Sequence, residues 1–227
     1  MTYITMLSET GAASASRARL YQWLSTLFAK EIDRETLDRY RQGAGQAVLK
    51  ELSTVPALEA GIKELQHLLN QINDTDDYAL ELAGAYGFLF LGAGGPQSVP
   101  PYESVHTSER GTMFQEAERQ TREILAKYGL SVSEDVREPA DHIAIQLELM
   151  ARLAETSVEA EAADAEHAGA LHIQQQAFLE DHLLNWVPAF SARCVEHDLS
   201  GFYAAIAQLT LTILKEDRVY LKKIVSH

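Results

Sequence analysis

The stretch E-P-A-D-H-I-A-I-Q-L-E-L, from Glu138 to Leu149, decides the fold because it reads as the beginning of a long apolar helix. Pro139 suits the first helical position, since the backbone N–H that proline lacks has no partner there in any helix. Asp141 then falls in the first turn, where free N–H groups and the helix dipole favour a negative charge. On a helical wheel Asp141 and His142 fall on different arcs. The arc of the histidine also holds Glu138, Ile145 and Leu149.

Apolar side chains recur at helical spacing along most of the chain. The stretches with this pattern are Leu20–Phe28, Leu58–Ile72, Tyr78–Leu89, Met113–Tyr128, Ile143–Ala154, Leu179–Trp186 and Phe202–Ile213. A repeat of three to four residues is the period of an α-helix with one buried face. We find no run of alternating apolar and polar residues that would predict a strand. The sequence therefore predicts an all-α fold.

Two stretches rich in turn-forming residues interrupt the helical pattern. Gly92–Pro101 reads as a loop from its glycine and proline content, and Tyr128–Arg137 contains a glycine placed as a helix stop. The second stretch predicts a boundary between an N-terminal helical lobe, residues 1–131, and a C-terminal helical lobe, residues 132–227. We expect the lobes to form one compact unit, with the connection at about residues 128–138.

The chain is strongly acidic, with a formal net charge of −14. Such a charge argues against a nucleic-acid partner, which requires basic residues to displace counterions, and against anionic membrane surfaces. It is compatible with a basic peptide partner that is attracted electrostatically. No apolar run reaches the roughly 18 residues that a membrane helix needs. We therefore expect neither nucleic-acid binding nor stable membrane insertion.

The first residues and the single cysteine bear on the cellular compartment. Met1–Gly11 contains Glu9 and no Lys or Arg, so it lacks the basic region and the apolar stretch of a secretory signal. We therefore expect the protein to stay in the cytoplasm. Cys194 has no second cysteine with which to form a disulfide, and its place in a helical pattern predicts a small buried apolar residue.

Candidate catalytic, nucleotide and metal sites fail on residue types or on spacing. Gly92–Gly95 lacks the Gly-Lys-Ser/Thr ending of a phosphate-binding loop and follows a helix instead of a strand. Two Glu-x-x-His pairs could suggest a di-iron bundle, but His67 faces away from its apolar stripe and His106 follows two prolines in an expected loop. Glu138 and His142 alone are too few to hold a metal. We expect no catalytic residue and no intrinsic metal, while a small helical nucleotide-binding or metal-binding protein stays open as a different class.

The chain resembles the TorD/DmsD family in three motifs: P-P-Y-E-S-V at Pro100–Val105, E-P-A-D-H at Glu138–His142, and H-L-L-N-W-V-P-A-F at His182–Phe190. The resemblance extends from about Ser16 to Asp217. Members of the family are all-helical, which implies a TorD-like bundle of roughly ten helices. They can exchange lobes between subunits, so the resemblance also implies a monomer that is able to form a domain-swapped dimer.

Members of this family are cytoplasmic chaperones that mature molybdenum oxidoreductases. The resemblance therefore implies a protein that is not an enzyme and that binds an apo molybdoenzyme and its twin-arginine signal peptide before export. The chain looks closer to the TorD branch, whose client is trimethylamine N-oxide reductase, than to the DmsD branch, which serves dimethyl sulfoxide reductase. Nitrate reductase assembly chaperones are a third alternative. The resemblance implies no intrinsic cofactor, since molybdopterin belongs to the client, although weak guanine nucleotide binding has been proposed for some members.

The family's recognition residues correspond to two groups in this chain. They are Glu138, Pro139, Asp141 and His142, and the loop residues Pro100, Pro101, Tyr102, Glu103 and Ser104. Tyr102 departs from relatives that carry Trp after the two prolines, which puts the choice of client in doubt. A signal with a basic segment followed by an apolar one would need a groove with apolar walls and acidic rims. We expect Tyr102 to cover or line such a pocket.

Overall fold

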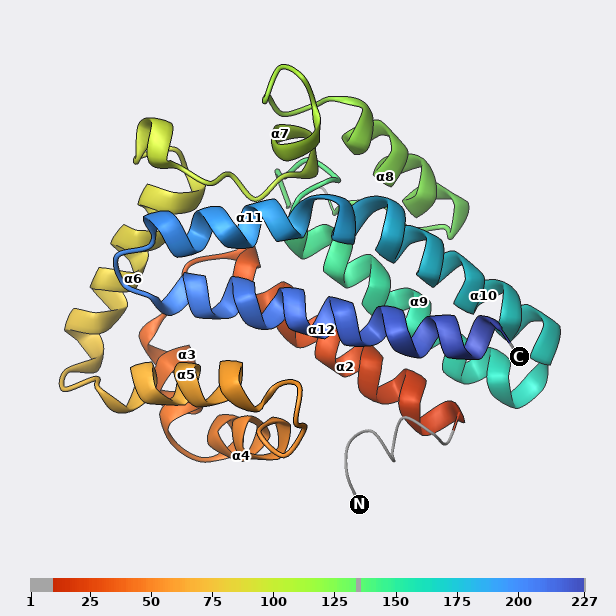
Figure 1. The fold of residues 1–227 in the computed structure, drawn as a ribbon, viewed down its shortest axis with the longest axis horizontal. Helices are drawn as coiled ribbons and strands as arrows, with labels where there is room; N and C mark the ends of the chain where they lie inside the picture. The colour runs from red at the N-terminus through yellow and green to blue at the C-terminus, as the bar shows by residue number, and fades with distance from the viewer. Residues whose placement is uncertain (1–9, 134–135, 227) are drawn as a thin grey trace.

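The computed structural model describes residues 10–133 and 136–226, and these residues are mostly helical (Figure 1). The α-helices are α2 (Thr10–Ala29), α3 (Arg34–Arg41), α4 (Ala44–Leu52), α5 (Glu59–Asn70), α6 (Thr75–Phe90), α7 (Glu103–Thr107), α8 (Glu116–Lys127), α9 (Ile143–Ala163), α10 (Ala165–Phe178), α11 (Leu184–His197) and α12 (Phe202–Val225). A 3₁₀ turn, η1 (Gly95–Gln97), and a π-helical turn, η2 (Leu179–Leu183), lie between them. The described residues contain no strand, and an isolated antiparallel bridge joins Tyr102 to His142. The predicted all-α fold class is confirmed.

Aspartates begin several helices at places where the apolar pattern breaks. Asp74 accepts hydrogen bonds from the backbone N–H groups of Asp76 and Asp77 at 2.8 and 3.2 Å, at the start of α6. Asp164 does the same for two N–H groups at the start of α10, both at 3.1 Å. These N–H groups have no partner within the helix, so the carboxylates stabilise the helix starts. Asp164 thereby allows α9 and α10 to follow each other with one residue between them.

The long helices form one bundle to which both halves of the chain contribute (Figure 1). α2 runs along α9, and α12 packs against α5, α10 and α11. Phe28 of α2 meets the rings of Phe90 and Phe190 edge on, with centroids 6.2 and 5.9 Å apart. Residues from the predicted N-terminal lobe therefore complete the core of the predicted C-terminal lobe.

A buried ion pair joins α2 to α12. The Arg17 guanidinium donates to both carboxylate oxygens of Asp217, at 2.5 and 2.9 Å, and the Tyr21 hydroxyl donates to the same carboxylate at 2.7 Å. The two charged side chains are 3% and 5% exposed. The bidentate geometry compensates part of the cost of burying both charges. This contact connects residues 200 positions apart in the sequence.

Two local sequence predictions have different outcomes. The expected loop around His106 is wrong, because His106 lies in α7 and its ring stacks on Trp186 with centroids 5.2 Å apart. Burial of side chains from α7 outweighs the weak helical signal after two prolines. Cys194 is fully buried, as predicted, and burial raises the pKa of its thiol.

The predicted connection begins where α8 ends. Gly129 has φ of 67°, a left-handed conformation that favours glycine and stops the helix as expected. Residues 134–135 of this connection, and residues 1–9 of the predicted N-terminal lobe, lie outside the described residues. The division into lobes at residue 131 stays a prediction.

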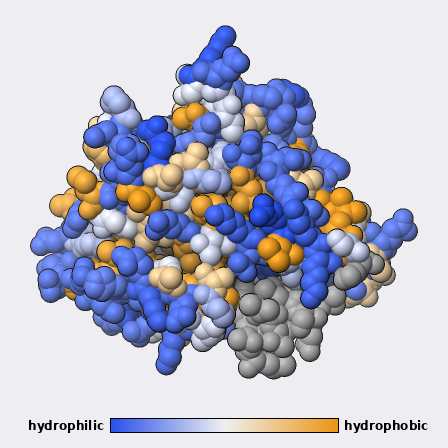
Figure 2. Space-filling model, viewed as in Figure 1, coloured by the Kyte–Doolittle hydropathy of each residue, from blue (hydrophilic) through white to orange (hydrophobic). Residues whose placement is uncertain are grey.

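The surface in the view of Figure 2 is largely hydrophilic, with small separate apolar patches over α11 and α12. Among the helices in the described part of the chain, none is both long enough and apolar enough to cross a bilayer.

Candidate functional site

The helix that follows E-P-A-D-H begins at Ile143, four residues later than the sequence predicts. His142 is the N-cap, and its Nδ1 accepts a hydrogen bond from the Ala144 N–H at 3.1 Å. Pro139 precedes the helix, and its carbonyl accepts from the His142 N–H in a turn at 3.0 Å. The predicted place of Pro139 at the first helical position, and of Asp141 in the first turn, is therefore wrong. The imidazole satisfies the helix start, which frees the aspartate for another partner.

Asp141 is fully buried and holds the segment Pro100–Ser104. Its Oδ2 accepts from the Ser104 N–H at 2.8 Å, and its carbonyl accepts from the Glu103 N–H at 3.1 Å. The Ile143 N–H donates to the Pro101 carbonyl at 2.9 Å, so the two motifs run side by side. Burial raises the pKa of Asp141, the hydrogen bonds from Ser104 oppose this, and the nearby Glu103 carboxylate adds to the increase.

Tyr102 covers His142 at the end of this segment. Its hydroxyl donates to Glu138 Oε2 at 2.5 Å, and its ring meets the imidazole edge on, with centroids 5.1 Å apart. His142 is 3% exposed. Burial lowers the pKa of His142 to about 4, with the Glu138 carboxylate acting in the opposite direction. The imidazole is therefore neutral at neutral pH, as its role as an acceptor requires.

The structure brings all nine predicted recognition residues together and buries most of them. Seven are buried, namely Pro101, Tyr102, Glu103, Ser104, Pro139, Asp141 and His142; Pro100 and Glu138 are half-buried. Most of this set therefore shapes the backbone. Two members of the set, Glu138 and His142, line a surface depression.

Such a depression lies between the end of α2, the end of α8 and the start of α9, and we call it the α8–α9 groove. Its volume is about 580 Å³. Apolar side chains form most of its walls: Leu125, Leu130, Val132, Val136, Ile145 and Leu149. Glu138 and His142 also line it. The helical wheel does not apply to these two residues, because both precede α9, but they line the same groove as Ile145 and Leu149.

Acidic residues dominate the charge at the groove. Glu138 lies at one end, and Glu148 lines the groove from the next turns of α9. Arg152 is the basic residue among the lining side chains, and it is paired with Glu148 at 3.0 Å and with Glu155 at 3.1 Å. Two carboxylates and one guanidinium therefore line the groove, which has apolar walls and a net negative charge.

The sequence missed the walls that come from outside the motif. Leu125 and Leu130 lie at the end of α8 and just after it, and Val132 and Val136 lie in the connection. The local sequence signal for these positions is the presence of two valines, Val132 and Val136, in a predicted linker. The sequence does not show which helix end these valines contact, because that depends on tertiary packing.

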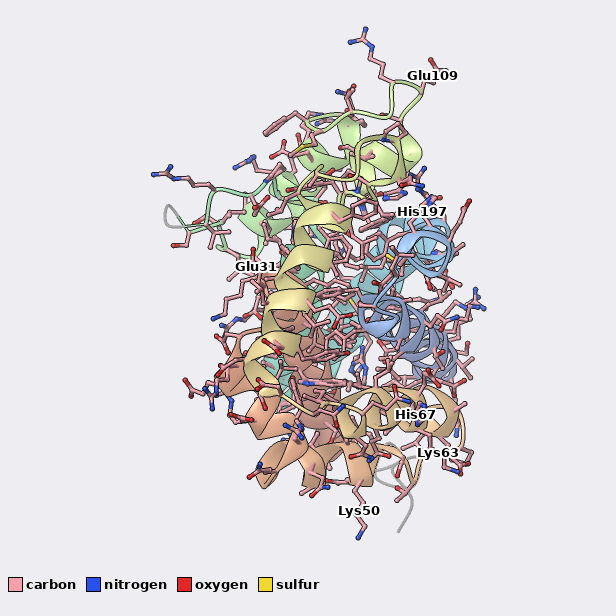
Figure 3. All side chains as sticks on the ribbon, turned by 90° about the vertical axis from the view of Figure 1, so that its left-hand side faces the viewer. Glu31, Lys50, Lys63, His67, Glu109 and His197 are labelled. Atoms are coloured by element: carbon pink, nitrogen blue, oxygen red, sulfur yellow. The ribbon has the colours of Figure 1, made fainter. Side chains whose placement is uncertain are left out.

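No cluster of three or more His, Cys, Asp or Glu side chains is placed to hold a metal in the residues that the structure describes. His67, from one of the two Glu-x-x-His pairs, is exposed on α5 near Lys63 (Figure 3). Glu103 and His106 of the other pair have separate partners, His182 and Trp186. Within the described residues, the two Glu-x-x-His pairs therefore do not converge on one site.

Comparison with known proteins gives consistent matches. A family model described as "Nitrate reductase delta subunit" matches residues 55–192. A relative from Vibrio cholerae serotype O1 (strain O395), named "Chaperone protein TorD", is 35% identical, covering 97% of this chain and 98% of its own length. The protein of the same name from Vibrio atlanticus is 37% identical, covering 95% and 99%. A crystal structure of a redox enzyme maturation protein from Archaeoglobus fulgidus has 24% identity and a TM-score of 0.46, covering 88% of this chain and 93% of that one.

Proposed function

Since this chain belongs to the TorD family of chaperones, we propose that it binds the apo form of a molybdopterin-containing reductase and that reductase's twin-arginine signal peptide. Binding takes place in the cytoplasm, before export, and keeps the signal from the export machinery until the cofactor is inserted. The relatives are named chaperones, and the chain is a chaperone and not an enzyme.

The α8–α9 groove is the observation that carries this proposal. A twin-arginine signal has a basic segment followed by an apolar one. An apolar peptide segment fits a groove walled by side chains such as Ile145 and Leu149, and it loses its contact with water there. The arginines then lie near Glu138, where opposite charge favours binding.

Trimethylamine N-oxide reductase is the client that we propose. The motifs of the chain look closest to the TorD branch, and several curated relatives carry the name of that branch. The family model is described by a nitrate reductase subunit, so a nitrate reductase is the second candidate client.

The experiment is titration of a labelled synthetic twin-arginine peptide, followed by fluorescence anisotropy. Ile145→Glu places a charge in the apolar wall, and we expect at least about a tenfold loss of affinity, since burying an unpaired charge is costly. Leu211→Glu is the matched control, because Leu211 in α12 is also half-buried but does not line the α8–α9 groove. Its affinity should stay within about twofold of the wild type, on the scale of a distant surface change.

Two results would contradict the proposal. The wild-type chain could fail to bind the peptide, or Ile145→Glu and Leu211→Glu could lower the affinity for the peptide equally. The same assay with the apo reductase in place of the peptide tests the client.

A further inference from the structure

A buried polar network lies beneath the segment Pro100–Ser104 and joins it to the third sequence motif. Its centre is the carboxylate of Glu103, the first residue of α7, which is 3% exposed. Gln146 Nε2 lies 2.5 Å from Glu103 Oε2, and His182 Nδ1 lies 2.9 and 3.2 Å from the two carboxylate oxygens. Glu103 therefore points into the bundle and away from any partner.

The donors and acceptors of this network have fixed directions. The Trp186 indole N–H donates to Gln146 Oε1 at 3.0 Å. An indole can only donate and a carboxylate can only accept, so the two ends of the Gln146 amide cannot be exchanged. His182 must in turn carry a proton on Nδ1 in order to donate to Glu103. Each group thus has one orientation that satisfies its partners.

His182 lies in η2, the π-helical turn between α10 and α11. A π-turn adds one residue to a helical turn; such turns are rare and are frequent at functional sites. Phe178 stacks on the His182 ring, with centroids 4.8 Å apart, which fixes the plane of the imidazole. The main chain is therefore adapted to place the imidazole against Glu103.

A second contact holds the other end of the segment. His106 stacks on Trp186, and its Nε2 lies 2.9 Å from the Pro100 carbonyl. Tyr102 lies between these two anchors and reaches Glu138 and His142, which line the α8–α9 groove. A displacement of Glu103 would therefore move Tyr102, and with it the end of the groove.

We infer that Gln146 and His182 are positioning residues for the α8–α9 groove: they act through Glu103 to hold Tyr102 against Glu138 and His142. This inference rests on the proposed function, because it names residues that set the affinity for the signal peptide without touching it. It also gives Glu103 a role in positioning instead of recognition.

A similar buried amide elsewhere in the bundle provides the control. Gln175 in α10 is fully buried and donates to Ser157 Oγ at 2.8 Å and to the Leu153 carbonyl at 3.4 Å. None of these three residues lines the groove or contacts the segment Pro100–Ser104. Gln175→Leu therefore removes an interior amide of the same kind and reports the effect of lost stability alone.

The test compares His182→Leu, Gln146→Leu and Gln175→Leu with the wild type, by titration of the labelled twin-arginine peptide well below each melting temperature. We expect His182→Leu and Gln146→Leu to lose about tenfold in affinity, the scale of one hydrogen bond to a charged group. Gln175→Leu should bind like the wild type. His182→Asn should recover most of the affinity, because its side-chain amide offers a donor near the position of Nδ1.

Wild-type affinity in His182→Leu, or an equal loss in Gln175→Leu, would overturn the inference. Amide hydrogen exchange gives a readout that needs no peptide. The N–H groups of Glu103, Ser104 and Ile143 should exchange faster in His182→Leu than in the wild type. In Gln175→Leu their exchange rates should equal those of the wild type. If the wild type does not bind the peptide, the proposed function fails. Independently of peptide binding, unchanged exchange at these three amides in His182→Leu would show that the network does not hold the segment.

Discussion

Asp141 and His142 hold two different parts of the backbone although they are neighbours. Asp141 Oδ2 binds the Ser104 amide, and its Oδ1 has no hydrogen-bond partner within the described residues. His142 caps α9 through Nδ1, which must keep its lone pair to accept from Ala144. Protonation of this nitrogen would remove the cap, so the start of α9 is sensitive to acid.

The pH dependence of unfolding should show this sensitivity. The pKa of His142 is lowered to about 4, so the unfolded chain takes up a proton near its ordinary pKa of 6.5 while the folded chain does not. The stability that His142 contributes is therefore complete above pH 6.5 and is lost as the pH falls towards 4. Between pH 7 and pH 5 this loss is about 2 kcal/mol. Urea titrations at the two pH values measure it.

His142→Asn is the matched variant for this measurement. Its carboxamide oxygen can accept from the Ala144 N–H, and asparagine is a favourable N-cap that does not titrate. Asp141, whose pKa is raised, gains stability as the pH falls and does so in both proteins. The difference between wild type and variant in this pH-dependent loss of stability is therefore the contribution of the His142 imidazole. An equal loss in the two proteins would show that His142 does not titrate as its burial implies.

Part of the salt dependence of the affinity for the peptide should come from the charge of Glu138. Glu138→Gln keeps an acceptor for the Tyr102 hydroxyl but removes the charge. We expect about a threefold loss of affinity at low salt, because a single exposed charge pair contributes up to about 1 kcal/mol. The loss should disappear at high salt, where the charges are screened. Glu159→Gln, which removes an exposed charge further along α9, should bind like the wild type at both salt concentrations.

The sequence predicts the residues of the site better than their roles. Motif residues such as Asp141 and Glu103 do meet in space, but both are buried. Gln146 lies four residues beyond the E-P-A-D-H motif, and nothing in the sequence marks its amide as buried. Its partners, Glu103 and Trp186, come from elements more than 35 residues away in the chain. Side-chain partners at such separations depend on the packed bundle and not on local pattern.

At the scale of elements, the apolar pattern of the sequence predicts where these helices lie but not the residues at which they begin and end. The stripes in α2, α5, α6, α9 and α12 lie where the sequence places them. The start of α9 was predicted wrongly because proline and aspartate are favourable in a first turn, and the same residues also suit the turn that precedes it. Tertiary contacts with the segment Pro100–Ser104 decide between the two.

Two glycines of the α6 region provide a stability prediction. Gly84 lies within α6, and an added Cβ would meet no atom within 4 Å. Gly84→Ala should raise the free energy of unfolding by up to about 1 kcal/mol, because alanine loses less entropy in a helix. Gly94 lies just after α6, and an added Cβ would come within 2.8 Å of the Phe88 carbonyl oxygen. Gly94→Ala should lower the free energy of unfolding by about 1–3 kcal/mol.

Urea unfolding of both variants checks this pair. The wild type and Gly84→Ala should differ in the midpoint and not in the slope. A destabilised Gly84→Ala would mean that its open face is covered in solution.

At the scale of the whole molecule, the bundle depends on contacts between the two halves of the chain. α2 lies along α9, and α5 and α6 contact α12. A predicted lobe of about a hundred residues would leave much of this core exposed. The connection after α8 can join a lobe to its own partner lobe or to that of a second molecule, which is the condition for domain swapping.

We therefore expect monomer and dimer to coexist and to exchange slowly, because exchange requires breaking the shared core. Size-exclusion chromatography of isolated dimer, repeated after days at low concentration, should show slow return to monomer. Brief exposure to partly denaturing urea should accelerate this exchange. A single monomeric peak at every concentration, also after refolding, would contradict the expectation.

The ion pair between Arg17 and Asp217 has a consequence for the synthesis of the protein. The arginine leaves the ribosome 200 residues before its partner. At about 5–20 residues per second, this interval lasts roughly 10–40 seconds. During that time Arg17 lacks its carboxylate partner from the last helix, while α9, along which α2 runs, is made first. The buried ion pair between α2 and α12 therefore forms only when almost the whole chain has been translated.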